Sequence, residues 1–195
     1  MCCAVTDTMT PPTKQESALE CRVLDASDAE AYWHFRLESL EREPLAFTEA
    51  PSEHRQMTIA ETAERLRQHP GNPSFVVGAF VNGKLAGIAG FYRQKGDKTR
   101  HKGHVFGVYV AAEHRGKSIA RQVMTELLRR ARALPGLEQV DLSVAETQPA
   151  ARKLYESLGF QVWGREPRAV KVGDKYVDEE WMVVRFDQGP LRGRI

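Results

Sequence analysis

The segment that decides the fold is VYVAAEHRGKSIA, residues 108–120 of the 195-residue chain. It reads as an apolar strand, a short polar turn and the start of a helix whose apolar residues Ile119, Val123 and Leu127 share one face. The first amides of such a helix point outward without partners, and the helix dipole adds partial positive charge. The turn therefore predicts a site for an anion such as a phosphorylated cofactor.

The side chains of this turn also suit an anion. Arg115 and Lys117 would add full positive charges, and the small residues beside them would let a diphosphate approach the backbone. An ordinary strand–helix turn with surface cations would give the same pattern. A nucleotide loop of the form G-x-x-x-x-G-K-S/T is a further alternative, because residues 116–118 are Gly-Lys-Ser, but its first glycine would fall on Ala111.

Hydrophobic patterns on both sides of this segment predict one mixed α/β domain. Strands are expected at residues 22–24, 75–81, 84–93, 104–110, 140–144, 160–163 and 175–186. Helices are expected from Ser27 to about Arg42, from Thr58 to near His69-Pro70-Gly71, over residues 119–131 and from Pro149 to Gly159. The first two helices start at S/T-x-x-E capping boxes, and Asn82-Gly83 predicts a tight hairpin between two of the strands.

The domain is expected to span residues 19–187, with a flexible tail at 1–18 and a second tail at 188–195. The 28 Lys and Arg against 26 Asp and Glu give a net charge of +2, which argues against a bulk nucleic-acid binder. No apolar run approaches the roughly 20 residues of a membrane span, and residues 1–20 lack the apolar region of a signal peptide. A cytoplasmic protein without nucleic-acid or membrane partners is therefore expected.

Cysteine and histidine spacing give no sign of a disulfide framework or a metal site. The three cysteines, Cys2, Cys3 and Cys21, are odd in number and favour a reducing compartment. The pair His101-x-x-His104 has a metal-like spacing, but the sequence offers no third ligand nearby. We therefore expect no metal.

Two segments together resemble the GCN5-related N-acetyltransferase (GNAT) family. The turn is similar to that family's pyrophosphate-binding consensus Gln/Arg-x-x-Gly-x-Gly/Ala, with Arg115 and Ala120 matching and Ser118 in place of the usual glycine. Residues 148–160, QPAARKLYESLGF, are similar to the family pattern N-x-x-A-x-x-L-Y-x-x-x-G-F, with Gln148 in place of asparagine. The resemblance covers about residues 20–187 in element order.

The resemblance implies a single GNAT-like domain, with a mixed antiparallel and parallel central sheet flanked by helices. Its fourth and fifth strands are expected to splay apart and to hold acetyl-CoA, the acetyl-donor cosubstrate, between them. The cofactor-binding residues implied are Val108, Tyr109, Val110, Arg115, Gly116, Lys117, Ser118, Ile119, Ala120, Gln148, Arg152 and Tyr155. A backbone amide near Val108 would polarise the thioester carbonyl.

Catalysis in the family is a direct attack by an amine on the thioester. Tyr155 matches the family's general acid, which would protonate the leaving thiolate, although a buried core tyrosine is the alternative. Glu146 and His104 are the candidates for the general base that deprotonates the amine, and each has a structural role as its alternative. The acceptor side is expected to be lined by Phe47, Trp163, Glu166, Tyr176, Asp178 and Glu179.

The function expected from these residues is N-acetylation of a primary amine of a small molecule, such as an amino acid or a polyamine. A protein or peptide N-acetyltransferase is the second reading, and an open acceptor groove would favour it. A non-catalytic acyl-CoA sensor is the third. The apolar C-terminal strands allow a homodimer.

Overall fold

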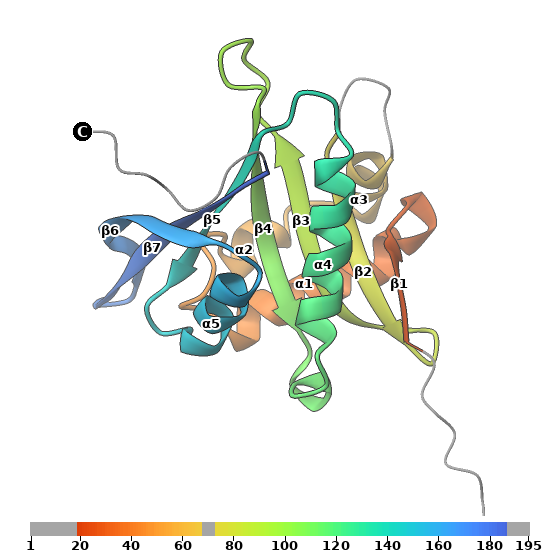
Figure 1. Cartoon of the computed structure of the whole chain (residues 1–195). Helices are drawn as coiled ribbons and strands as arrows, with labels where there is room; N and C mark the ends of the chain where they lie inside the picture. Colours follow the sequence, from red (N-terminus) through yellow and green to blue (C-terminus); the bar gives the residue numbers. More distant parts are fainter. Residues whose placement is uncertain (1–18, 68–72, 187–195) are drawn as a thin grey trace, which may run out of the picture.

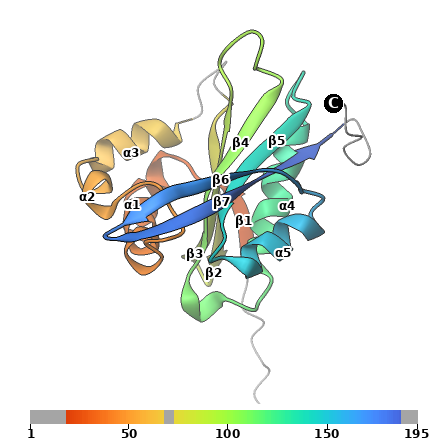
Figure 2. The same ribbon diagram turned by 90° about the vertical axis from the view of Figure 1, so that its left-hand side faces the viewer.

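The computed structural model describes residues 19–67 and 73–186. The elements in chain order are β1 (Leu19–Val23), α1 (Ala29–Arg42), α2 (Pro51–His54), α3 (Ile59–Leu66), β2 (Phe75–Val81), β3 (Lys84–Arg93), β4 (Lys102–Val110), α4 (Ile119–Arg132), β5 (Gln139–Ala145), α5 (Pro149–Ser157), β6 (Gln161–Val172) and β7 (Lys175–Arg185). One seven-stranded sheet has the order β1-β2-β3-β4-β5-β7-β6. Helices α1, α2 and α3 lie on one face of this sheet, and α4 and α5 lie on the other (Figures 1 and 2).

The junction between β4 and β5 is the one parallel pairing in this sheet. It extends only from the pair Lys102–Gln139 to the pair His104–Asp141, after which the strands separate (Figure 1). The other neighbours are antiparallel, and β5 pairs with β7 along its whole length. The prediction of a mixed sheet with splayed fourth and fifth strands is confirmed.

Both faces of the sheet carry a packed core. On the α4 side, Val123, Met124 and Leu127 are at most 1% exposed and pack with buried strand residues such as Val77 and Phe91. Burial of side chains of this size contributes about 1.5–3 kcal/mol each. A second cluster under α1 includes the next strand positions, because successive strand side chains point to opposite faces. The amphipathic pattern of α4 therefore fixes which face of the sheet it covers.

The hairpin predicted at Asn82-Gly83 is confirmed. Asn82 has φ 51° and Gly83 has φ 77°, the positive values that a two-residue type I′ turn requires. The turn joins β2 to β3, and the bounds of both strands are those expected from their sequences.

Besides a shift of β1, which spans Leu19–Val23 rather than residues 22–24, three expectations about element boundaries were wrong. The first capping box uses Asp25 and Asp28 rather than Ser27, because a short 3₁₀ turn at Ala26–Asp28 precedes α1. Helix α3 ends at Leu66, earlier than expected, and the predicted end at His69-Pro70-Gly71 lies outside the described residues.

The third error concerns β6, which continues to Val172 instead of ending at Trp163. It is the edge strand of the sheet, and it is irregular between Glu166 and Val170. An edge strand tolerates Pro167 and a polar sequence, because one of its sides needs no hydrogen-bonding partner. The short helix α2 was not predicted. The predicted tails at 1–18 and 188–195 lie outside the described residues. Within the described residues, the predicted elements occur in the expected order, with α2 in addition.

The ion pair at the start of α1 leads to a prediction for stability. Asp28 accepts hydrogen bonds from Arg22 at 2.6 and 2.7 Å and from the Asp25 amide at 2.9 Å, and the bond to Arg22 lowers the pKa of the Asp28 carboxyl. We expect Asp28→Asn to lower the free energy of unfolding by about 1–3 kcal/mol near pH 7. Urea unfolding measures this loss, with Asp97→Asn in an exposed loop as the control.

The loss should also depend on pH. A lowered folded pKa stabilises the protein fully above the ordinary aspartate value of about 3.9, and this stabilisation is lost as pH falls through the folded value. The difference between the wild type and Asp28→Asn should therefore shrink in acid. An equal difference at pH 7 and pH 3 would contradict this assignment.

Candidate active site

A cavity of about 360 Å³ opens where β4 and β5 separate. Its walls come from both strands, from α5 and from the segment that follows α1. The predicted site residues that line it are His104, Val108, Tyr109, Val110, Arg115, Ala120, Gln148 and Tyr155. The separation of two parallel neighbours thus brings together residues from both predicted motifs.

A bulge in β4 faces this cavity. The register with β3 shifts between the pair Ile88–Tyr109 and the pair Gly90–Phe106, which leaves one extra residue on β4. Gly107 lies in the bulge with φ 62°, and a Cβ added there would lie 3.4 Å from a guanidinium nitrogen of Arg36. A bulge takes backbone groups out of the strand ladder and bends the strand. Backbone donors of this part of β4 are therefore available to a ligand in the cavity.

The turn before α4 has the backbone of an anion site. Gly116 has φ 75° and Ser118, the N-cap of α4, has φ 61°. The Ser118 side chain makes no capping hydrogen bond, and the first turn of α4 has no acidic residue. The amides of this turn are therefore left to a ligand, and the helix dipole favours a negative one. Residues 116–119 do not line the cavity, but their neighbours on both sides, Arg115 and Ala120, do.

Glu43, which follows α1, crosses the cavity mouth to both motifs. Its carboxylate accepts from the Arg115 guanidinium at 2.8 Å and from the Gln148 amide at 3.4 Å. The bond to Glu43 raises the pKa of Arg115. Lys117 donates to the Glu113 carbonyl at 3.0 Å and is exposed. An anion that binds Arg115 must therefore compete with Glu43.

Tyr155 is the most buried polar residue among the predicted catalytic residues. It is 5% exposed on α5, its ring centroid lies 6.0 Å from that of Phe160, and its burial raises the pKa of the phenol. The residue lines the cavity. The phenol therefore stays protonated and can donate to a ligand.

His104 is the other predicted catalytic residue at the cavity. Its Nδ1 lies 2.6 Å from Oδ1 of Asp141. These two residues form the last pair of the parallel contact between β4 and β5. The Tyr92 and Trp181 rings flank the imidazole at 5.1 and 5.9 Å. Asp141 was not among the predicted residues, because only the parallel register, which the local sequence does not specify, places it beside His104. The carboxylate fixes the orientation of the imidazole and leaves Nε2 for another partner.

Other predicted residues lie away from the cavity. Glu146 is exposed and pairs with Arg165 at 2.8 Å, while Arg152 donates to Glu180 at 2.5 Å. Neither of them lines the cavity. Of the expected acceptor residues, Phe47 and Glu179 line it. The expected residues that do not line it are Trp163, Glu166, Tyr176 and Asp178.

Two further findings concern the described residues only. They hold no group of three or more His, Cys, Asp or Glu side chains that could bind a metal ion. None of their helices is both long and apolar enough to cross a membrane.

This fold, with its mixed sheet that opens between two parallel strands, superposes on solved structures of GNAT-family acetyltransferases. The sequence profile of the Acetyltransferase (GNAT) family matches residues 33–160. The chain therefore belongs to this family, and the predicted resemblance is confirmed.

Individual acetyltransferases are also similar to this chain in sequence. A mycothiol acetyltransferase from Thermobispora bispora is 35% identical over 108 residues, which cover 52% of this chain and 36% of that protein. A spermidine N(1)-acetyltransferase from Vibrio cholerae is 30% identical over 84 residues, which cover 43% of this chain and 49% of that protein. The matches thus span about a third to a half of these two relatives.

A solved structure agrees in fold. An acetyltransferase structure from Salmonella typhimurium, determined with its cofactor acetyl-CoA, superposes with a TM-score of 0.72 at 22% identity. The superposition covers 92% of this chain and 100% of that one.

The left-handed N-cap of α4 leads to a prediction. A β-branched residue is strained at φ 61°, so we expect Ser118→Val to lower the free energy of unfolding by about 1–2 kcal/mol. Ser118→Gly should not lower it by a comparable amount, because glycine adopts positive φ freely. Chemical denaturation measures both, with Ser52→Val at an exposed position of α2 as the control for the same side-chain change. Equal losses at positions 118 and 52 would contradict the left-handed backbone.

Proposed function

We propose that the protein is an N-acetyltransferase that transfers an acetyl group from acetyl-CoA to a primary amine of a small molecule. The observation that carries this proposal is the cavity between β4 and β5, which is lined by the β4 bulge, by Tyr155 and by His104. Family membership and the names of the relatives support the same reaction.

The residues present fit acetyl-CoA. The uncapped α4 N-terminus and Arg115 suit its diphosphate, and a Cβ added at Gly116 would meet nothing within 4 Å, so the backbone can be approached closely. The space between the separated strands suits the narrow pantetheine arm, which would use backbone groups of Val108 and its neighbours. When bound, acetyl-CoA supplies a thioester carbonyl that an amine can attack. We assign Gly116, Lys117, Ser118 and Ile119 to the diphosphate by their backbone amides.

His104 is the residue that we assign as general base. A protonated amine has no lone pair, so the ammonium proton must leave before the nitrogen bonds to the acetyl carbon and the carbon–sulfur bond breaks. His104 lines the cavity, and Asp141 holds its Nδ1 at 2.6 Å, so Nε2 is the atom that would take the proton. Glu146 is the weaker candidate, because it is exposed and bound to Arg165.

Tyr155 is the residue that we assign to the leaving thiolate. Its raised pKa keeps the phenol protonated, and the residue lines the cavity. A phenol above its ordinary pKa of about 10 holds its proton more tightly than a thiol of about 8.5 does. Tyr155 therefore acts mainly as a hydrogen-bond donor that stabilises the developing negative charge on sulfur.

The cavity walls support a small acceptor rather than a peptide. Glu43, Ala46 and Phe47, which follow α1, line the cavity together with Glu179 from β7. Glu43 also bonds across to Arg115, so this segment covers part of the opening. A peptide needs an open groove on this side.

A cytoplasmic location and a homodimer remain part of the proposal.

The proposal is tested by incubating the protein with acetyl-CoA and a panel of primary amines while free thiol is measured. Thiol release that depends on an amine, with the acetylated amine found by mass spectrometry, is the expected result. Binding of acetyl-CoA without turnover across small amines and peptides would instead support an acyl-CoA sensor. Turnover with peptides only would support the protein acetyltransferase.

Removing the Tyr155 hydroxyl should slow the reaction without affecting donor binding. We expect Tyr155→Phe to lower kcat by about 10²-fold. The KM for acetyl-CoA should change by less than about twofold, because the ring still fills the same space. Steady-state kinetics measures both constants, and an unchanged melting temperature shows that the variant is folded. An unchanged kcat, when chemistry limits turnover, would contradict the role of the hydroxyl.

Loss of the His104 base should change the pH dependence. We expect His104→Gln to lower kcat/KM by about 10²-fold at pH 7 and to regain rate as pH rises and the amine loses its proton unaided. Asp141→Asn should lower the rate by about tenfold, because the imidazole loses its fixed orientation. His101→Gln, three residues earlier in the chain, is the matched control. A parallel fall at every pH would show that His104 has only a structural role.

A further inference from the structure

A second cavity, of about 350 Å³, lies on the face of the sheet that α1 and α3 cover. Its walls come from α1, the α2–α3 segment and strands β2, β3 and β4. Phe106 and Arg36 line this cavity and the one between β4 and β5. The two cavities therefore adjoin at these two side chains.

The strand side of the second cavity is apolar and carries two aromatic rings. The rings of Tyr92 and Phe106 lie 6.0 Å apart. Both residues line the cavity, as does Leu66 from α3. Rings of this kind bind apolar groups and stack on other rings.

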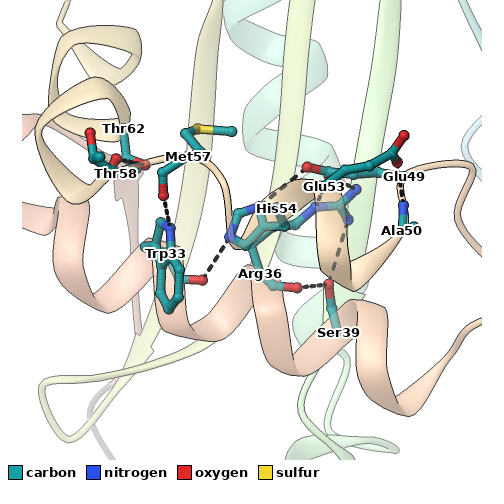
Figure 3. A network of polar contacts seen from close by, with 10 residues as sticks. All are labelled: Trp33, Arg36, Ser39, Glu49, Ala50, Glu53, His54, Met57, Thr58 and Thr62. Carbon is teal, nitrogen blue, oxygen red and sulfur yellow. Dashed lines mark hydrogen bonds and ion pairs between the residues drawn. The ribbon is translucent and has the colours of Figure 1, made fainter.

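The polar groups on the helix side bind mainly one another. Glu49 accepts from the Arg36 guanidinium at 2.9 Å and lies 3.2 Å from Nδ1 of His54 (Figure 3). His54 Nε2 is 3.0 Å from the Trp33 carbonyl, and the Thr62 hydroxyl donates to the Thr58 carbonyl at 3.0 Å (Figure 3). Because these groups are already paired, this wall presents few polar groups to a ligand.

The charge of the second cavity also argues against a highly charged occupant. Its charged side chains are Arg36, Arg65, Glu49 and Glu64, two of each sign. Arg36 is 7% exposed, and its charge is balanced by Glu49 at 2.9 Å. A polyamine would need an excess of carboxylates to replace its hydration.

A path of ring contacts joins the second cavity to the proposed base. The His104 ring lies 5.1 Å from the Tyr92 ring, and Tyr92 lines the second cavity. An amine at His104 would therefore have its substituent directed past Tyr92 and Phe106. Since a cavity of about 150 Å³ holds benzene, a cavity of about 350 Å³ is large enough for a substituted ring.

We propose that the second cavity holds the apolar ring of the acceptor, which makes the substrate an arylalkylamine rather than a polyamine. This inference rests on the proposed function, because it places the amine beside His104. Burial of the ring in the cavity would favour such a substrate, and the amine would lie beside His104.

The proposal is tested by comparing 2-phenylethylamine, spermidine and methylamine as acceptors for the whole chain. We expect kcat/KM for 2-phenylethylamine to exceed that for spermidine by at least about tenfold, since burial of a ring contributes more than 1.4 kcal/mol. Met57 lines the second cavity, and its hydrogen bonds are made by its backbone: the amide donates to the His54 carbonyl, and the carbonyl accepts from Trp33. Met57→Trp should fill the cavity and raise the KM for 2-phenylethylamine about tenfold, with kcat/KM for methylamine unchanged.

Ile59→Trp is the matched control, because Ile59 is exposed on α3 and does not line the cavity. It should leave the KM for 2-phenylethylamine unchanged. No preference for 2-phenylethylamine over spermidine, or an equal effect of the two tryptophan variants, would overturn the proposal.

Binding of 2-phenylethanol separates this proposal from the proposed function, because the alcohol carries the ring without an amine. Isothermal titration should detect binding to the wild type and to Ile59→Trp, and at least about tenfold weaker binding to Met57→Trp. If the alcohol binds in this pattern and no amine is acetylated, the ring site stands and the proposed function fails. If amines are acetylated but the alcohol does not bind, the ring site is overturned and the proposed function stands.

Discussion

The short parallel contact between β4 and β5 is the constraint on which the rest of the molecule depends. Two parallel neighbours need a crossover connection, and α4 supplies it on one face of the sheet. The contact ends at the pair His104–Asp141, because β4 bends at the Gly107 bulge while β5 follows β7 to Ala145. The separation opens the first cavity, and the crossover places the N-terminus of α4 at the mouth of that cavity.

The same separation explains why a polar pair sits within the sheet. His104 and Asp141 occupy the last paired positions, where the side chains are partly covered by Tyr92 and Trp181 but still reach the cavity. In a continuous sheet this position would be filled by apolar residues. A charged partner at 2.6 Å satisfies the imidazole where water has limited access.

Local patterns predicted most of the fold, because each depends on residues close in sequence. Asn82-Gly83 specified its hairpin, and the stripe on α4 specified a helix with one buried face. The full length of the edge strand β6 was not predictable in this way. Its polar residues do not form a strand-like pattern, and they are in a strand because they lie beside β7. For the site, the two motifs predicted several residues that line the first cavity, such as Arg115 and Tyr155. Asp141 was not predicted, because its place beside His104 depends on a strand register that joins residues 37 apart in the chain. The second cavity depends on how α1 and α3 pack on the sheet, which no single segment encodes.

The wall formed by Phe106 and Arg36 has a consequence for the thermodynamics of the molecule. Because the same two side chains line both cavities, an occupant that moves them on one side changes the shape of the other side. Such a coupling is reciprocal, so each ligand alters the affinity for the other by the same factor. Arg36 is held by Glu49 and packs against the Gly107 bulge and the Phe47 ring, which makes the wall stiff. Because this wall can move little, the factor by which each ligand alters the affinity for the other should be small.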